Sequence, residues 1–159
     1  MSDFEVQDPD FAARVRASFE RQLVMGTIGA ELTRIEPGLC EIQLDYRKDL
    51  TQQHGYLHAG IATTIADSAG GYAAYSLMPK EASILAVEFK VNLVRPAKGQ
   101  RFRARGEVLQ PGRRLSVCRI QVEAIDGEDV RVCLIGQQTS ICLMGESDTP
   151  DRGSRNSIG

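Results

Sequence analysis

Residues 52–60 and Asp67, which follows them, are the best candidates for a reactive site in this sequence. The segment is polar and glycine-rich, and it leads into the apolar, alanine-rich stretch 59–78, in which Asp67 is the only ionisable carboxylate. An unpaired carboxylate in apolar surroundings is costly, whereas one that activates water or attacks a carbonyl carbon has a chemical reason to be there. Asp67 is therefore the candidate general base or nucleophile. The alternative is a structural aspartate bonded to backbone amides or to an arginine of a sheet.

The stretch that carries Asp67 is predicted to be a buried helix, and its first residues have chemical potential of their own. The first amides of a helix have no partner within it and carry partial positive charge. When such amides point at a carbonyl group, they form an oxyanion hole. Ala59 and Gly60 occupy these positions and have no bulk to block a substrate.

The N-terminal region predicts an amphipathic helix. Asp8 and Pro9 have the pattern of an N-cap and a first-turn proline, and Gly26 is the predicted stop. Apolar residues recur every four positions between these signals, at Phe11, Val15, Phe19 and Leu23.

Apolar and polar residues alternate in six further segments, which predicts strands. The first two form a hairpin joined at Pro37 and Gly38, and the other four follow the central helix with turn residues between them. Meandering strands form antiparallel sheets. The predicted fold class is therefore α+β, an antiparallel sheet wrapped around one long central helix, with an N-terminal helix. The six segments cover about residues 28–33, 40–46, 87–93, 101–108, 118–124 and 130–144.

The chain length fits one domain, which we expect to span residues 1–145. Residues 146–159 are polar apart from one isoleucine and cannot bury enough surface to order themselves. They are predicted to form a disordered C-terminal tail.

Composition excludes several classes of function. The net charge of −2 argues against a general nucleic-acid binder, and no apolar run is long enough to span a membrane. The N-terminus is acidic and lacks the features of a signal peptide, which predicts a cytoplasmic protein. Four dispersed cysteines are expected to be small buried residues rather than metal ligands. His54 and His58 lack a nearby third ligand, so no metal site is predicted.

The motif His58-Ala59-Gly60 followed by Asp67 resembles the PaaI-type branch of the hotdog-fold thioesterases. The resemblance covers about residues 20–144 and includes residues 92–99 and the triplet 112–114. It implies a hotdog fold and hydrolysis of an acyl-CoA to free acid and coenzyme A. By this resemblance Asp67 is the catalytic carboxylate, acting as general base or nucleophile, and the Ala59 amide polarises the thioester carbonyl beside Gly60. Gln52 takes the place of a common asparagine, and His58 shapes the site.

One feature of the family's pattern is missing. Related enzymes often carry a serine or threonine a few residues before the Arg-Pro segment, and this chain has Ala86 at that position. Ser83 or Thr64 would have to supply the hydroxyl that positions water.

The spacing of the catalytic groups predicts a dimer. Asp67 lies about 12 Å along the helix from Ala59, whereas groups that act on one thioester must lie within about 3 Å of it. Two chains related by a two-fold axis can bring the helix start of one to Asp67 of the other. We therefore expect a homodimer that is obligatory for activity, assembling further to a homotetramer.

Residues 95–119 contain eight arginines and lysines and one glutamate, a local balance of 8 − 1 = +7. The planar guanidinium group of arginine binds phosphate oxygens well, and coenzyme A carries phosphate groups. Coenzyme A is part of the expected substrate, so no separate cofactor is expected. Arg95, Arg113 and Arg114 lie at turns and are the predicted phosphate contacts. The remaining arginines of the first strand in this region are interpreted as its solvated face: Arg101, Arg103 and Arg105.

The acyl group is expected to be aromatic or of short to medium length. Four apolar residues in the second half of the central helix either line its pocket or belong to the core: Tyr72, Tyr75, Leu77 and Met78. Two other functions are compatible with the same fold. One is a sensor that binds acyl-CoA without turning it over, and the other is a dehydratase, for which the sequence lacks the required pairing of a histidine with an acid.

Overall fold

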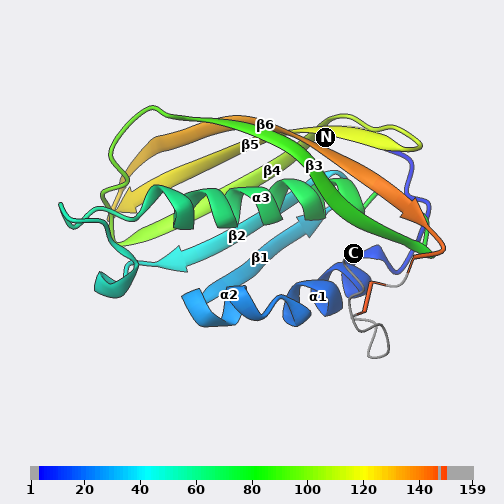
Figure 1. Cartoon of the computed structure of the whole chain (residues 1–159), viewed down its shortest axis with the longest axis horizontal. Helices are drawn as coiled ribbons and strands as arrows, with labels where there is room; N and C mark the ends of the chain where they lie inside the picture. The colour runs from blue at the N-terminus through cyan, green and yellow to red at the C-terminus, as the bar shows by residue number, and fades with distance from the viewer. Residues whose placement is uncertain (1–3, 147, 150–159) are drawn as a thin grey trace, which may run out of the picture.

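A curved antiparallel sheet wraps around one long helix, α3 (Ala59–Tyr75), in the computed structural model, which describes residues 4–146, 148 and 149 (Figure 1). The six strands run in the order β1-β2-β4-β5-β6-β3. The predicted α+β class and the sheet around a central helix are confirmed. The bounds are β1 Ala30–Glu36, β2 Leu39–Asp45, β3 Ala82–Leu93, β4 Arg101–Gln110, β5 Leu115–Asp126 and β6 Asp129–Met144.

The N-terminal helix consists of two pieces rather than one. Helix α1 (Phe11–Arg21) and helix α2 (Leu23–Ile28) are separated by Gln22, whose backbone is extended. Helix α2 continues past the predicted stop at Gly26 and ends at Gly29, which has the left-handed conformation (φ 75°) that terminates helices. As a result, β1 begins two residues later than predicted.

The start of α1 also differs from the prediction, because Asp10 rather than Asp8 is the N-cap residue. The Asp8 carboxylate accepts a hydrogen bond from the Asp10 amide at 3.0 Å and forms an ion pair with Arg14 at 2.9 Å. The Arg14 guanidinium in turn donates to the carbonyl oxygens that follow α3, including those of Met78 and Pro79. Through Arg14, Asp8 therefore connects the first helix to the end of the central helix, and it does not cap the first helix.

Helix α3 lies against the concave face of the sheet because small residues allow a close approach. Gly106 on β4 faces the backbone of Ala69, and a Cβ atom added there would meet the Ala69 carbonyl oxygen far inside van der Waals contact. The helix is buried on most of its sides, as its uniformly apolar sequence predicts. A short 3₁₀ helix (Lys48–Leu50) and a turn lead from β2 to its first residue.

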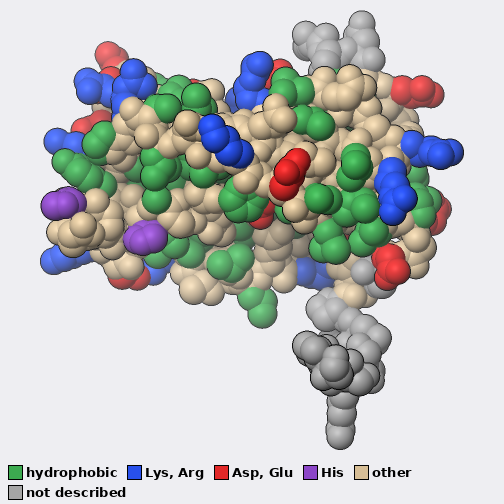
Figure 2. All heavy atoms as spheres, turned by 45° about the horizontal axis from the view of Figure 1, so that its top comes forward, with side chains coloured by type: hydrophobic (Ala, Val, Ile, Leu, Met, Phe, Trp, Pro, Cys, Tyr) green, Lys and Arg blue, Asp and Glu red, His purple; other side chains and the backbone are tan. Residues whose placement is uncertain are grey.

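Strand β3 lies at one edge of the sheet and carries exposed apolar side chains. It pairs with β6 on one side only. Leu85, Val87, Phe89 and Leu93 are each between 45% and 59% exposed. Figure 2 shows hydrophobic side chains spread over the molecular face turned to the viewer, with charged side chains at its two ends and a few between them. Monomeric proteins usually protect such an edge.

The remaining predictions concern the cysteines, the tail and the membrane. All four cysteines are free and buried, as expected. The predicted tail falls largely outside the described residues, since 147 and 150–159 are not among them. None of the helices in the described ranges combines the length and the apolar character needed to cross a bilayer.

The contact between α3 and β4 makes a prediction about stability. Gly106→Ala should lower the free energy of unfolding by about 1–3 kcal/mol, because the added methyl group overpacks the interface between helix and sheet. Gly26→Ala is the matched control, since its methyl group would meet no atom within 4 Å. That exchange should raise stability by about 0.5–1 kcal/mol through helix propensity. Urea unfolding of both variants measures the difference, and equal stabilities would contradict the close approach.

Candidate active site

Asp67 lies in the middle of α3 and lines a cavity of about 360 Å³. The side chain is half-buried, and desolvation by burial raises the pKa of its carboxyl group above the usual aspartate value. The described ion pairs include none with Asp67, so no arginine of the sheet neutralises it. A carboxylate with a raised pKa is a better general base near neutral pH. The site therefore has the chemical character expected of a reactive acid.

Gln138, on β6, is the residue that contacts the Asp67 side chain. Its Nε2 atom donates to Asp67 Oδ1 at 2.5 Å and to the Asp67 backbone carbonyl at 3.1 Å. The Gln138 side chain is almost completely buried. Sequence reasoning missed this residue, although a signal was present: two glutamines follow each other in a strand, and the period of two forces one of them inward.

Several elements contribute the other walls of the Asp67 cavity. Helix α1 and the break after it provide Ser18, Arg21 and Gln22. The Tyr72 hydroxyl donates to Ser18 Oγ at 3.2 Å, and Ser68 Oγ donates to Gln22 Oε1 at 3.0 Å. The cavity therefore combines apolar walls with fixed hydroxyl and amide groups. Tyr72 lines this cavity and is also almost completely buried in the core.

The hydroxyl that Ala86 lacks has one candidate replacement in this cavity. Ser83 and Ala86 both line it from β3, on the wall nearest the sheet edge. Thr64, the other candidate, does not line it, and its hydroxyl donates to the Gly60 carbonyl at 2.8 Å. Of the two alternatives, the geometry favours Ser83.

His58 is the N-cap residue of α3. Its Nδ1 atom accepts a hydrogen bond from the Gly60 amide at 2.9 Å, which occupies one of the two predicted amide donors. The Ala59 amide, at the first helical position, has no acceptor within the helix. Ala59 thus carries the amide that is left for a ligand at this helix start, and the His58 ring fixes the geometry of the turn.

Gln52 and Ala59 line a second cavity of about 420 Å³, together with Tyr56 and Arg95. Asp67 is not among its lining residues, just as Gln52 and Ala59 are absent from the lining of the Asp67 cavity. The structure therefore brings Gln52 and Ala59 together and separates them from the carboxylate within one chain, whereas His58 and Gly60 line a different, smaller cavity.

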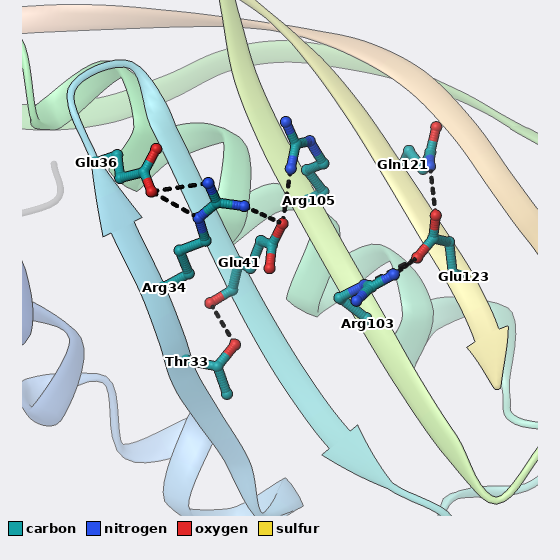
Figure 3. A network of polar contacts seen from close by, with 8 residues as sticks. All are labelled: Thr33, Arg34, Glu36, Glu41, Arg103, Arg105, Gln121 and Glu123. Atoms are coloured by element: carbon teal, nitrogen blue, oxygen red, sulfur yellow. Dashed lines mark hydrogen bonds and ion pairs between the residues drawn. The ribbon is translucent and has the colours of Figure 1, made fainter. Parts of the chain in front are cut away.

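The predicted solvated arginines are confirmed as surface residues of the sheet (Figure 3). Arg105 pairs with Glu41 at 2.7 Å, and Arg103 pairs with Glu123 at 2.5 Å, in each case across neighbouring strands. Arg101 pairs with Asp45 at 2.9 Å. Acidic partners on adjacent strands neutralise these charges, so these three arginines hold the outer face of the sheet together.

The three arginines predicted to contact coenzyme A are not gathered into one place. Arg95 lines the helix-start cavity and donates to the Val132 carbonyl at 3.0 Å. Arg113 lines a different cavity of about 550 Å³ beyond the end of α3, which Leu77 also lines. Arg114, the next residue after Arg113, is exposed in the turn between β4 and β5.

The described residues contain no group of three or more histidine, cysteine, aspartate or glutamate side chains arranged to hold a metal ion.

Comparisons with known proteins agree with this geometry. A family model described as the thioesterase superfamily matches residues 54–131. A thioesterase family protein from Silicibacter pomeroyi, known from its crystal structure, is 48% identical, covers 85% of this chain and is itself covered to 99%, with a TM-score of 0.84. A 1,4-dihydroxy-2-naphthoyl-CoA hydrolase from Listeria monocytogenes is 25% identical over 96 residues, which are 60% of this chain and 78% of the relative.

The chain belongs to the thioesterase superfamily, and its fold is the hotdog fold. The PaaI protein of E. coli shares that fold, with a TM-score of 0.76 at 16% identity over 87% of this chain and 97% of PaaI. The fold and the family implied by the resemblance of the sequence are thereby confirmed.

The desolvation of Asp67 predicts a pH dependence of stability. A carboxyl group whose pKa is raised by folding binds protons more tightly in the native state, so the folded state loses stability as pH rises from the ordinary aspartate pKa through the raised one. Asp67→Asn removes this loss. The stability of the variant relative to wild type should therefore increase with pH across that window, as measured by urea unfolding.

The Asp126→Asn exchange, at the exposed last residue of β5, is the control and should show no such trend. A stability difference between Asp67→Asn and wild type that stays constant with pH would contradict the desolvation of Asp67.

Proposed function

We propose that this protein is an acyl-CoA thioesterase that hydrolyses an aromatic or short to medium-chain acyl-CoA to the free acid and coenzyme A. The observation that carries the proposal is a desolvated carboxylate, Asp67, which forms none of the described ion pairs and lines a cavity in a chain of the thioesterase superfamily. The relative from Listeria monocytogenes that is named as a hydrolase of a CoA thioester supports this substrate class.

In the proposed reaction, the Asp67 carboxylate takes a proton from water, and the resulting hydroxide attacks the thioester carbonyl carbon. Negative charge develops on the carbonyl oxygen, where the Ala59 amide stabilises it. The carbon–sulfur bond then breaks, and the thiolate of coenzyme A leaves and takes up a proton. Direct attack by the carboxylate is the alternative, in which water hydrolyses an acyl–aspartate anhydride in a second step.

Both groups act on one thioester only if two chains contribute, because they line separate cavities in one protomer. Strand β3 is the proposed contact surface between the two chains. Its apolar residues are exposed at an edge that has no strand partner among the described residues, and a two-fold axis would pair it antiparallel with the same strand of a second copy. The proposed assembly is therefore a homodimer, with a homotetramer as the further step.

Antiparallel pairing of β3 also brings the two kinds of cavity together. The first half of the strand, residues 83–86, lines the Asp67 cavity, while its last residue and the segment that follows, 93–97, line the helix-start cavity. When two antiparallel copies pair, the first half of one strand lies beside the end of the other. Asp67 of one chain is then placed near the helix start of its partner, and each dimer has two composite sites.

The remaining components of the site follow the same assignment. Gln52 and Arg95 line the helix-start cavity and are proposed to contact the thioester region and coenzyme A, respectively. Arg113 and Arg114, on the turn between β4 and β5, are proposed as further contacts to its phosphate groups. Cytoplasmic location remains a prediction from the sequence.

Asp67→Asn tests the catalytic assignment. Purified wild-type protein should release thiol from members of a panel of aromatic and aliphatic acyl-CoAs, and Asp67→Asn should lose about 10²-fold or more of that rate, the usual effect of removing a general base. A thiol-reactive chromogenic reagent follows the release. Equal rates would remove Asp67 from its role. Tight binding of acyl-CoA without turnover by the wild type would favour a sensor instead.

Ala59→Pro tests the amide donor, because proline removes the N–H group at a helical position that tolerates it. We expect about 10²–10³-fold loss of kcat in a protein that keeps its fold, while the control Ala59→Ser, which retains the amide, stays active. Circular dichroism verifies the fold.

Mixing the two inactive variants tests the shared site. A heterodimer of Asp67→Asn with Ala59→Pro has one site in which both groups are intact, so random exchange of subunits should restore about a quarter of the wild-type activity. No recovery after verified subunit exchange would show that both groups act within one chain.

A further inference from the structure

The buried amide of Gln138 is bound to Asp67 by two hydrogen bonds. Gln138 is 1% exposed and lies on β6, which packs behind α3. Its Nε2 atom donates both to Oδ1 and to the backbone carbonyl of Asp67. One amide group therefore holds both the carboxylate and the turn of helix that carries it.

Keeping this side chain in the core has a cost. Gln138 Oε1 is buried and accepts no hydrogen bond from the described residues, and an unsatisfied buried acceptor is destabilising. Gly70 makes room for it, since a Cβ atom at that position would collide with Gln138 Oε1. An apolar side chain of similar size would avoid the orphaned oxygen.

The orientation of the amide is fixed by its neighbours. Exchange of its oxygen and nitrogen would turn a carbonyl oxygen toward two other acceptors, the carboxylate and the carbonyl of Asp67, which repel it. The donor must therefore face Asp67. The second carboxylate oxygen, Oδ2, makes no hydrogen bond with the described residues and belongs to a side chain that lines the cavity.

We propose that Gln138 is a positioning residue that holds Asp67 through Oδ1, so that Oδ2 is presented to the attacking water or to the thioester carbon. The proposal rests on the catalytic role given to Asp67 above. It assigns no contact between Gln138 and the substrate, and its effect passes entirely through the carboxylate.

The other titratable side chains around this cavity do not duplicate that role. Arg21, from α1, is ion-paired with Asp148, which lines the same cavity. Burial raises the pKa of Tyr72 to about 12, so its hydroxyl stays protonated at neutral pH. The β3 and β6 residues that line the cavity carry no charge. Gln138 is therefore the donor that stabilises the ionised form of Asp67 from the sheet side.

A donor to a carboxylate favours the charged form and opposes the effect of burial. Removing the donor should raise the pKa of Asp67 further and release the carboxylate from its fixed orientation. Gln138→Met removes the donor at similar size. Gln137→Met is the matched control, because Gln137 is the neighbouring glutamine on the same strand and is exposed.

The experiment measures the pKa of Asp67 directly, by carbon-13 NMR of the labelled carboxyl group in the full chain, and in parallel the pH profile of thiol release from acyl-CoA. In Gln138→Met we expect the Asp67 pKa to rise, kcat to fall about tenfold or more and KM to change little. Gln137→Met should match wild type in all three measurements.

An unchanged Asp67 pKa in folded Gln138→Met would overturn the proposal. Gln138→Glu is the second variant if the first does not fold, since an added carboxyl group would share a proton with Asp67 and raise the pair's upper apparent pKa. An unchanged titration there would overturn it equally. If the wild type released no thiol, the proposed function would fail, while the titration would still report whether Gln138 holds Asp67.

Discussion

The structure depends on one constraint, which is that α3 must be covered on all sides. Its sequence has no polar face, so exposure to water is unfavourable on every side of the helix. One sheet of six strands covers it, and the glycine at position 106 lets the helix lie close enough to β4 to exclude water. Within this helix, a single carboxylate is partly shielded from solvent, and its raised pKa is a direct result of the same packing.

The cover ends at β3, where the sheet has no further strand in the described part of the chain. The apolar side chains exposed there and the separation of the two cavities have a common origin, because one protomer surrounds its helix incompletely. A second copy at that edge would complete both the burial and the site. In the proposed assembly, folding energy and catalytic geometry therefore depend on the same strand, which links stability of the dimer to activity.

Much of this arrangement could be predicted from the sequence, and the parts that could not share a physical reason. Strong period-two patterns located the strands after the central helix, and the lone Asp67 located the candidate reactive group. The break at Gln22 was missed because the apolar stripe of the first helix runs through it without a glycine or proline. Gln138 was missed because its partner is 71 residues away in the sequence, and only the pairing of β6 in the sheet determines which of two adjacent glutamines faces inward.

The break at Gln22 has a consequence for how substrate range could diverge among related chains. It allows the end of α1 to turn toward the Asp67 cavity, so that Ser18, Arg21 and Gln22 form a wall that comes from outside the sheet. Substitutions in this peripheral segment would alter the depth and polarity of the pocket while leaving the strands and the central helix untouched. In the proposed enzyme, the part of the fold that can be adapted to a new acyl group is thus separate from the part that holds the proposed catalytic residue.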